Sequence, residues 1–141
     1  MILICIVFMI NEKLNKDILD LINENKTEIN NLKGKMLWKN NNPTINFNAQ
    51  NVNLLDSDWD SYEVIYGANT SSDSKLMSAK SIKGRGCKLN SKVDANGICD
   101  REIQYKSQEL LYINGAFVNN STRNECLIPL YIIGYKTGLF S

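Results

Sequence analysis

Three aspartates at alternate positions form the densest acidic cluster in the sequence. Asp56, Asp58 and Asp60, within "DSDWDSYE", match the first three ligand positions of a calcium-binding loop. That loop type has glycine at its sixth position and glutamate at its twelfth, where this chain has Ser61 and Gly67. We therefore expect a polar turn between strands and regard the three aspartates as a weak calcium candidate.

The sequence contains no histidine, which removes most of the usual catalytic groups. Ser-His and Cys-His nucleophiles, histidine general bases and histidine-bound metals all need that side chain. A carboxylate pair remains, from Asp100 and Glu102 or from the Asp56–Asp60 cluster, but glycosidases hold their two carboxyls roughly 5–9.5 Å apart across a cleft. We expect no enzyme, no cofactor and no bound transition metal.

The four cysteines lack the C-x-x-C spacing of zinc sites. A Cys87–Cys99 disulfide would need an oxidising compartment. Free, buried thiols that act as small apolar side chains are the expected state of Cys5, Cys87, Cys99 and Cys126.

Length and charge set further limits. A chain of 141 residues holds one domain, or a small domain with an extension. A net charge of +1 without a basic cluster predicts no nucleic-acid partner. The opening "MILICIVFMI" is too short to span a bilayer and lacks the charged start of a signal peptide, so we expect it to belong to the mature chain without membrane insertion. Asparagine is unusually frequent, with 20 residues, as in proteins from AT-rich genomes.

A stretch without proline, and without glycine before Gly34, predicts an N-terminal helix over residues 1–36. Heptad assignment places seven apolar residues and three asparagines at the ten core positions: Phe8, Asn15, Ile22, Ile29 and Met36 at a, and Ile4, Asn11, Ile18, Asn25 and Leu32 at d. Isoleucine at both a and d favours three or four strands over two. We expect a trimeric coiled-coil stalk with an interface that includes Ile18, Ile22, Asn25, Ile29 and Leu32. A helix lying on the sheet of its own domain would need a similar apolar stripe and remains the alternative.

Short strands follow the helix over residues 37–141. Alternation predicts one strand over Ile45–Leu54 with a bulge at Gln50–Asn51, and further strands at Tyr62–Tyr66 and Leu76–Ile82. Asn96-Gly97 predicts a hairpin between Leu89–Val93 and Ile98–Tyr105, and Asn114-Gly115 predicts a second turn. The apolar run Cys126–Tyr135 is typical of an interior strand, with Pro129 at its start or at a bulge. Seven or eight strands indicate a β-sandwich or jelly-roll-like domain, so the expected fold is mainly β.

Three of these segments together resemble a known module. "LWKNNNPTINFNAQNVNL" (residues 37–54), "YEVIYG" (residues 62–67) and "CLIPLYIIGYKTGLF" (residues 126–140) are similar to the C-terminal β-module of tail proteins from phages and prophages of Gram-positive bacteria. The resemblance covers about the last hundred residues, and the chain has Glu63 where such modules often carry aspartate and Leu130 where tyrosine is common.

This resemblance implies a non-enzymatic, homotrimeric component of the tail tip, in the baseplate or a fibre. The protein would be made in the cytoplasm of the bacterial host and incorporated into the virion. Other tail proteins and a host cell-wall polysaccharide would be its partners. The alternative function is a secreted, monomeric carbohydrate-binding β-sandwich of a bacterial protein. The two differ in the helix, which the monomer would pack against its own domain.

Overall fold

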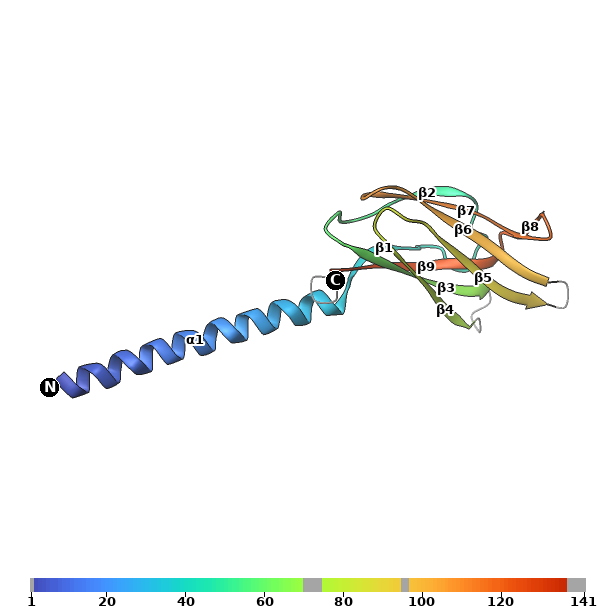
Figure 1. Ribbon diagram of the computed structural model, residues 1–141. Coiled ribbons are helices and arrows are strands. Elements are labelled where there is room, and N and C mark those ends of the chain that lie inside the picture. The colour runs from blue at the N-terminus through green and yellow to red at the C-terminus, as the bar shows by residue number, and fades with distance from the viewer. Residues whose placement is uncertain (1, 70–74, 95–96, 137–141) are drawn as a thin grey trace.

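One long helix precedes two antiparallel sheets in the computed structural model, which describes residues 2–69, 75–94 and 97–136 (Figure 1). The fold is mainly β with an N-terminal helix, as predicted. Its elements are α1 (Ile2–Lys33), β1 (Lys35–Lys39), β2 (Gln50–Asn53), β3 (Ser61–Asn69), β4 (Leu76–Ile82), β5 (Cys87–Asp94), β6 (Gly97–Ser107), β7 (Leu110–Val118), β8 (Ser121–Thr122) and β9 (Cys126–Tyr135).

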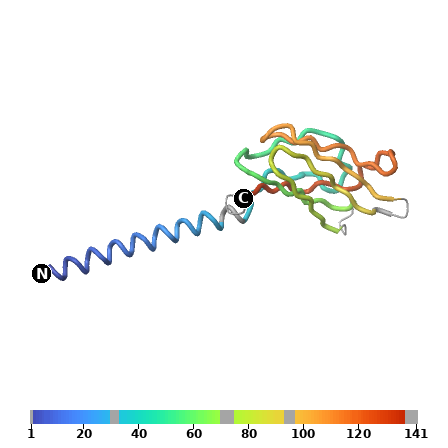
Figure 2. The backbone as a smooth tube through the Cα atoms, viewed as in Figure 1, coloured from blue at the N-terminus to red at the C-terminus, as the bar shows by residue number. Residues whose placement is uncertain are grey.

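The two sheets form the layers of a β-sandwich (Figure 2). One sheet has the order β1-β9-β3-β4, and the other has the order β2-β7-β6-β5 with β8 paired to β7. Alternate side chains of both sheets enter one core, which includes Val64 and Ile132 from the first sheet and Ile103 and Leu111 from the second. The apolar face of each sheet is thereby removed from water.

The helix ends at Lys33, three residues before the predicted end. Gly34 adopts a φ of +68°, a left-handed conformation that glycine reaches without strain. A Cβ atom at this position would lie 2.6 Å from the ring of Tyr135, so the close approach also requires glycine. Met36 belongs to β1 and pairs with Ile133 of β9. The assignment of Met36 to the coiled-coil core was therefore wrong.

The predicted strand over Ile45–Leu54 is formed only in its second half, as β2. Residues 45–49 do not form a strand, because the backbone hydrogen bonds of Phe47 go to partners that are not neighbouring strands of a sheet. Its N–H donates to Asn124 O at 3.0 Å, and its carbonyl accepts from the guanidinium of Arg101 at 2.9 Å. Pairing of β2 with β7 is regular, so the bulge predicted at Gln50–Asn51 is absent.

Asn114-Gly115 was wrongly predicted as a hairpin turn. Both residues lie within the continuous strand β7, where the register with β6 slips between Arg101 and Ile103. Ala116 is paired with Arg101 and Ile113 with Ile103, which leaves one extra residue in β7. The sequence signal for a turn therefore marks a β-bulge, which tolerates the same residue types.

The final strand behaves as predicted. β9 lies between β1 and β3, and its register with β3 slips between Ile65 and Tyr66, beside Pro129. Proline is accommodated at this bulge although its backbone nitrogen cannot donate a hydrogen bond to the neighbouring strand.

The strands β5 and β6 pair as the predicted hairpin, whereas Asn96 of the turn between them lies outside the described residues. In β4 the alternating residues Leu76, Ser78, Lys80 and Ile82 lie on the outer face of the sheet, where their side chains are exposed.

A buried arginine side chain forms hydrogen bonds to several segments of the sandwich. The side chain of Arg101 is inaccessible to solvent and donates to four backbone carbonyls, at 2.9 Å to Phe47, 2.7 Å to Asn114, 3.4 Å to Asn124 and 3.0 Å to Cys126. Its guanidinium also lies 5.3 Å from the ring centre of Phe47. Burial lowers the pKa of Arg101 to about 10. One side chain thereby connects β6, the β7 bulge, the start of β9 and the loop before β2.

Candidate functional site

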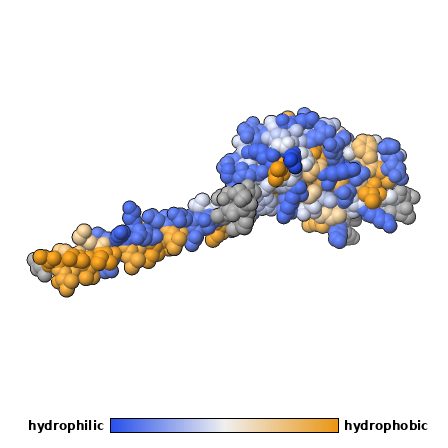
Figure 3. Space-filling model, in the orientation of Figure 1, coloured by the Kyte–Doolittle hydropathy of each residue, from blue (hydrophilic) through white to orange (hydrophobic). Residues whose placement is uncertain are grey.

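The helix presents an apolar stripe that the described part of the chain leaves uncovered. Its predicted core positions Ile18, Ile22 and Ile29 are 47%, 44% and 50% exposed. Asn25 is also exposed, while the side chain of Leu32 lies outside the described part of the structure. Figure 3 shows apolar side chains along one margin of the helix and polar ones along the other. The sequence pattern thus corresponds to an exposed, mainly apolar surface along the helix.

The helix does not lie on its own sandwich. All described side chains between Ile2 and Ile29 are exposed, and α1 meets the domain at β9. Figure 1 shows the helix extending away from the sheets. The packed-helix alternative does not describe this arrangement.

Two of the three aspartates of the calcium candidate, Asp56 and Asp58, are paired with lysines. Asp56 lies 2.7 Å from Lys35, and Asp58 lies 2.5 Å from Lys136. The hydrogen bond from Lys35 lowers the pKa of Asp56, and that from Lys136 lowers the pKa of Asp58. Across the described ranges, no three side chains of His, Cys, Asp or Glu are grouped as metal ligands. The two ion pairs connect the turn before β3 to β1 and to the residue that follows β9.

Asp100 and Glu102 lie two residues apart on β6. This spacing places both on the outer face of one strand, about 6.6 Å apart along it. Lys88 of β5 lies opposite Glu102 and forms an ion pair of 3.2 Å with Asp100. The carboxylates flank a lysine on a sheet surface instead of facing each other across a cleft.

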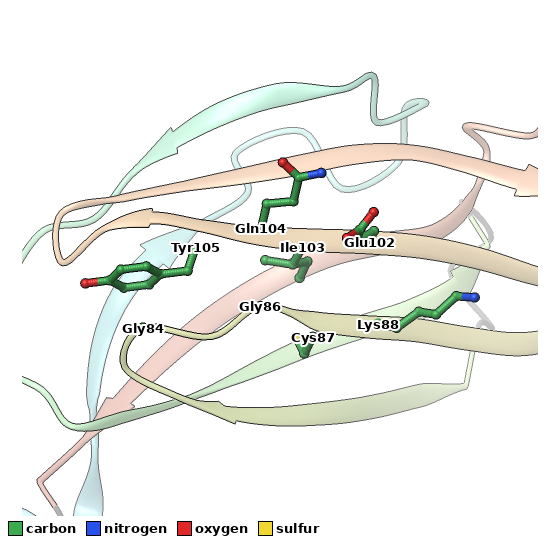
Figure 4. A pocket seen from close by; sticks show the side chains of 8 residues that line it. All are labelled: Gly84, Gly86, Cys87, Lys88, Glu102, Ile103, Gln104 and Tyr105. Carbon is green, nitrogen blue, oxygen red and sulfur yellow. The ribbon is translucent and has the colours of Figure 1, made fainter.

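A shallow groove of 660 Å³ lies between the turn at Gly84–Gly86 and β6 (Figure 4). Gly86 is pressed against β6, since a Cβ atom there would lie 2.1 Å from the carbonyl oxygen of Ile103. The nearest potential nucleophile is Cys87, but burial raises the pKa of its thiol. A thiol with a raised pKa is a poor nucleophile.

The other cysteines follow the predicted pattern in part. Cys99 and Cys126 are buried, and burial raises the pKa of Cys99 to about 12, whereas Cys5 is exposed on the helix. All four are free, and the register places Ser91, not Cys87, opposite Cys99.

Another hollow, of 230 Å³, is lined mainly by amides. It lies where β1 leads into the irregular loop, and its walls are Trp38, Lys39, Asn40, Asn41, Asn42, Ile45, Asn46, Phe47 and Gln50. The rings of Trp38 and Phe47 meet edge to face, with centres 5.9 Å apart and an angle of 82°. We call this hollow the amide pocket.

The amide pocket was not predicted as a site. A usable signal was present, because an aromatic residue at position 38 is followed by three asparagines and a proline. Reading residues 45–54 as one strand placed Asn46 on a flat sheet face, separate from the asparagines at positions 40–42. The loop that gathers them depends on Arg101 and Asn124, which are distant in sequence.

Comparison with known proteins adds no relatives: no protein-family model matches the chain, and no curated protein or solved structure matches it significantly. Among the described residues, no helix combines the length and the apolarity that a membrane crossing requires.

Proposed function

We propose that the protein is a non-enzymatic component of a phage or prophage tail tip, in the baseplate or a fibre, that assembles as a homotrimer through its helix. The observation that carries this proposal is the exposed stripe on α1. Among the helix side chains that the structure describes, fourteen large apolar ones are exposed: Ile2, Leu3, Ile4, Ile6, Val7, Phe8, Met9, Ile10, Leu14, Ile18, Leu19, Leu21, Ile22 and Ile29.

Isolated copies of this helix would be poorly stable in water. A helix owes most of its stability in proteins to packing of its apolar face, and a stripe of this size is normally covered. The occupant proposed is a second and third copy of the chain, because apolar residues recur at heptad spacing and isoleucine occupies both a and d positions. Nine of the ten heptad positions lie within α1 as it ends at Lys33.

The arrangement suits a stalk with a head. Thirty-two helical residues extend about 50 Å at 1.5 Å per residue, and the sandwich follows directly after Gly34. A parallel trimer would hold three sandwiches side by side at one end. Together with the resemblance of residues 37–141 to tail modules, this supports assembly with other tail proteins and presentation of the sandwich to a polysaccharide of the host wall.

The proposal is tested on particles from the bacterium that carries the gene. Tailed particles are induced, purified on a density gradient and labelled with antibodies raised against residues 35–141. We expect the protein in the particle fraction and label at the tail end. Expression of the protein in the cells without its recovery in purified particles would contradict a virion role.

A further inference from the structure

We propose that the amide pocket binds one neutral sugar ring of a surface glycan. The inference deepens the proposed function and rests on it, because it assigns the polysaccharide contact to particular residues. The inference rests on a loop that is fixed by hydrogen bonds and that places the unbonded amides of Asn41 and Asn46 near the indole ring of Trp38.

The loop is held at both ends by buried groups. Asn40 is 8% exposed, and its side chain donates to Pro129 O at 2.8 Å while accepting from the N–H of Asn42 at 2.9 Å. The other end is held by Phe47, which is 4% exposed and is bonded through its backbone to Asn124 and Arg101. A loop fixed in this way loses little conformational entropy when a ligand binds.

Two amides on this loop are free for a ligand. Asn41 and Asn46 are exposed, and within the described residues neither side chain makes a hydrogen bond to the protein. Each amide offers two donors and an acceptor, which suits the adjacent hydroxyl groups of a sugar. Trp38 adds an apolar surface, and the contact with Phe47 fixes its orientation. Pockets that combine an aromatic wall with a few placed polar groups are typical binding sites.

Charge and size narrow the ligand class. Lys39 is the one charged residue among those lining the pocket, so most of the polar contact is neutral and costs less to desolvate than charge. The volume of 230 Å³ is below the roughly 300–1,000 Å³ typical of pockets for drug-sized ligands, which favours a single ring of a longer chain.

The location also fits recognition at a tip. Lys35 of β1 pairs with Gly134 beside the helix, whereas Asn40 bonds to Pro129 and Leu130 farther along β9. Strand β1 therefore carries the chain about 16 Å from the helix end to the edge of the pocket. A stalk formed by α1 would leave this pocket uncovered by the chain's own helix.

The test is binding of the full chain to an array of neutral and anionic fragments of Gram-positive wall polysaccharides. Hits are followed by tryptophan fluorescence, which is informative because Trp59 is fully buried and Trp38 is not. We expect binding to neutral fragments with a change in emission. The double variant Asn41→Ala/Asn46→Ala should bind about tenfold more weakly, since two hydrogen-bonding groups are lost. The matched control, Asn53→Ala/Asn90→Ala, removes two exposed amides elsewhere and should bind like the parent.

Three results would overturn the assignment: no binding to any neutral fragment, binding to anionic fragments alone, or parental affinity in the Asn41/Asn46 variant. The mass of each sample in solution separates this inference from the assembly on which it rests. A trimer without glycan binding rejects the pocket alone. A monomer that binds through Asn41 and Asn46 retains the pocket and rejects the proposed stalk.

Discussion

The helix and the sandwich differ in the solvent exposure of their apolar residues. In the described part of the sandwich, nineteen hydrophobic residues form one buried core, and its strands pair within the chain. In the helix, apolar side chains from Ile2 to Ile29 face outward. The sandwich therefore has its core within one chain, whereas in the proposed trimer the helix would be stabilised by other chains that cover it.

Polar groups within apolar surroundings show the same contrast. Arg101 is buried in the sandwich, and its guanidinium is bonded to four carbonyls of its own chain. Asn25 interrupts the apolar stripe of the helix, and its partners would have to come from other copies across a seam. The first group supports the fold of one chain, and the second would set the number and alignment of chains.

Loss of β9 should have the largest effect. A chain that stops after Glu125 loses the strand between β1 and β3, together with buried side chains such as Leu127 and Ile132. Two strands would be left with unpaired backbone groups, so we expect insoluble protein. The matched deletion begins at Lys35 and removes the helix alone, and it should be soluble and unfold cooperatively. A soluble, cooperatively unfolding chain without β9 would contradict the assignment of this strand.

Arg101→Met should destabilise the sandwich by about 3 kcal/mol, because it leaves buried carbonyls without their donor. Urea unfolding of a chain that begins at Lys35 measures the effect without a contribution from assembly. Arg85→Met is the control, since the side chain of Arg85 is exposed. Equal losses in the two variants would show that the buried hydrogen bonds contribute little.

Asn25→Ile should raise the stability of the assembled helix by about 1 kcal/mol per chain, because an amide in the seam is replaced by an apolar side chain. The same change should broaden the distribution of oligomers, since a polar core residue restricts alignment. Thermal unfolding and light scattering measure the two effects. Asn23→Ile, outside the seam, is the control, and the same gain in both variants would refute a specific role for Asn25.

Local pattern was sufficient for much of this fold. The period of the apolar residues predicted the helix, the run from Cys126 predicted an interior strand, and the Asn96-Gly97 dipeptide predicted the pairing of β5 with β6. Each depends on residues close together in sequence. The same reasoning failed for the 45–49 segment, where Arg101, 54 residues from Phe47, withdraws the backbone from a ladder.

Of the two candidate sites, one could likewise be predicted from local sequence and the other could not. The helix stripe could be read from heptad spacing, since all its members share one element. The amide pocket could not, because Asn40 is held by Pro129, 89 residues away. At Asn114-Gly115 the composition was informative but ambiguous, since turns and bulges accept the same residues.

Asp56→Asn should give the smallest change. The pKa of Asp56 in the folded chain is lowered from 3.8, so its ion pair with Lys35 stabilises the fold above that pH and the contribution is lost as the pH falls below it. The parent should therefore lose slightly more stability than the variant between about pH 5 and pH 3. Urea unfolding across this range measures the difference, with Asp20→Asn on the helix as control. A larger acid loss in the Asp56 variant would reverse the expected sign.

The mass of the intact protein in solution tests the central contrast most directly. Light scattering across a range of concentrations should give about 48 kDa, three times the 16.0 kDa of one chain, and a chain that begins at Lys35 should be smaller and mainly monomeric. A parent that stays at 16.0 kDa throughout would contradict the account, because the apolar face of the helix would then have no copies to cover it.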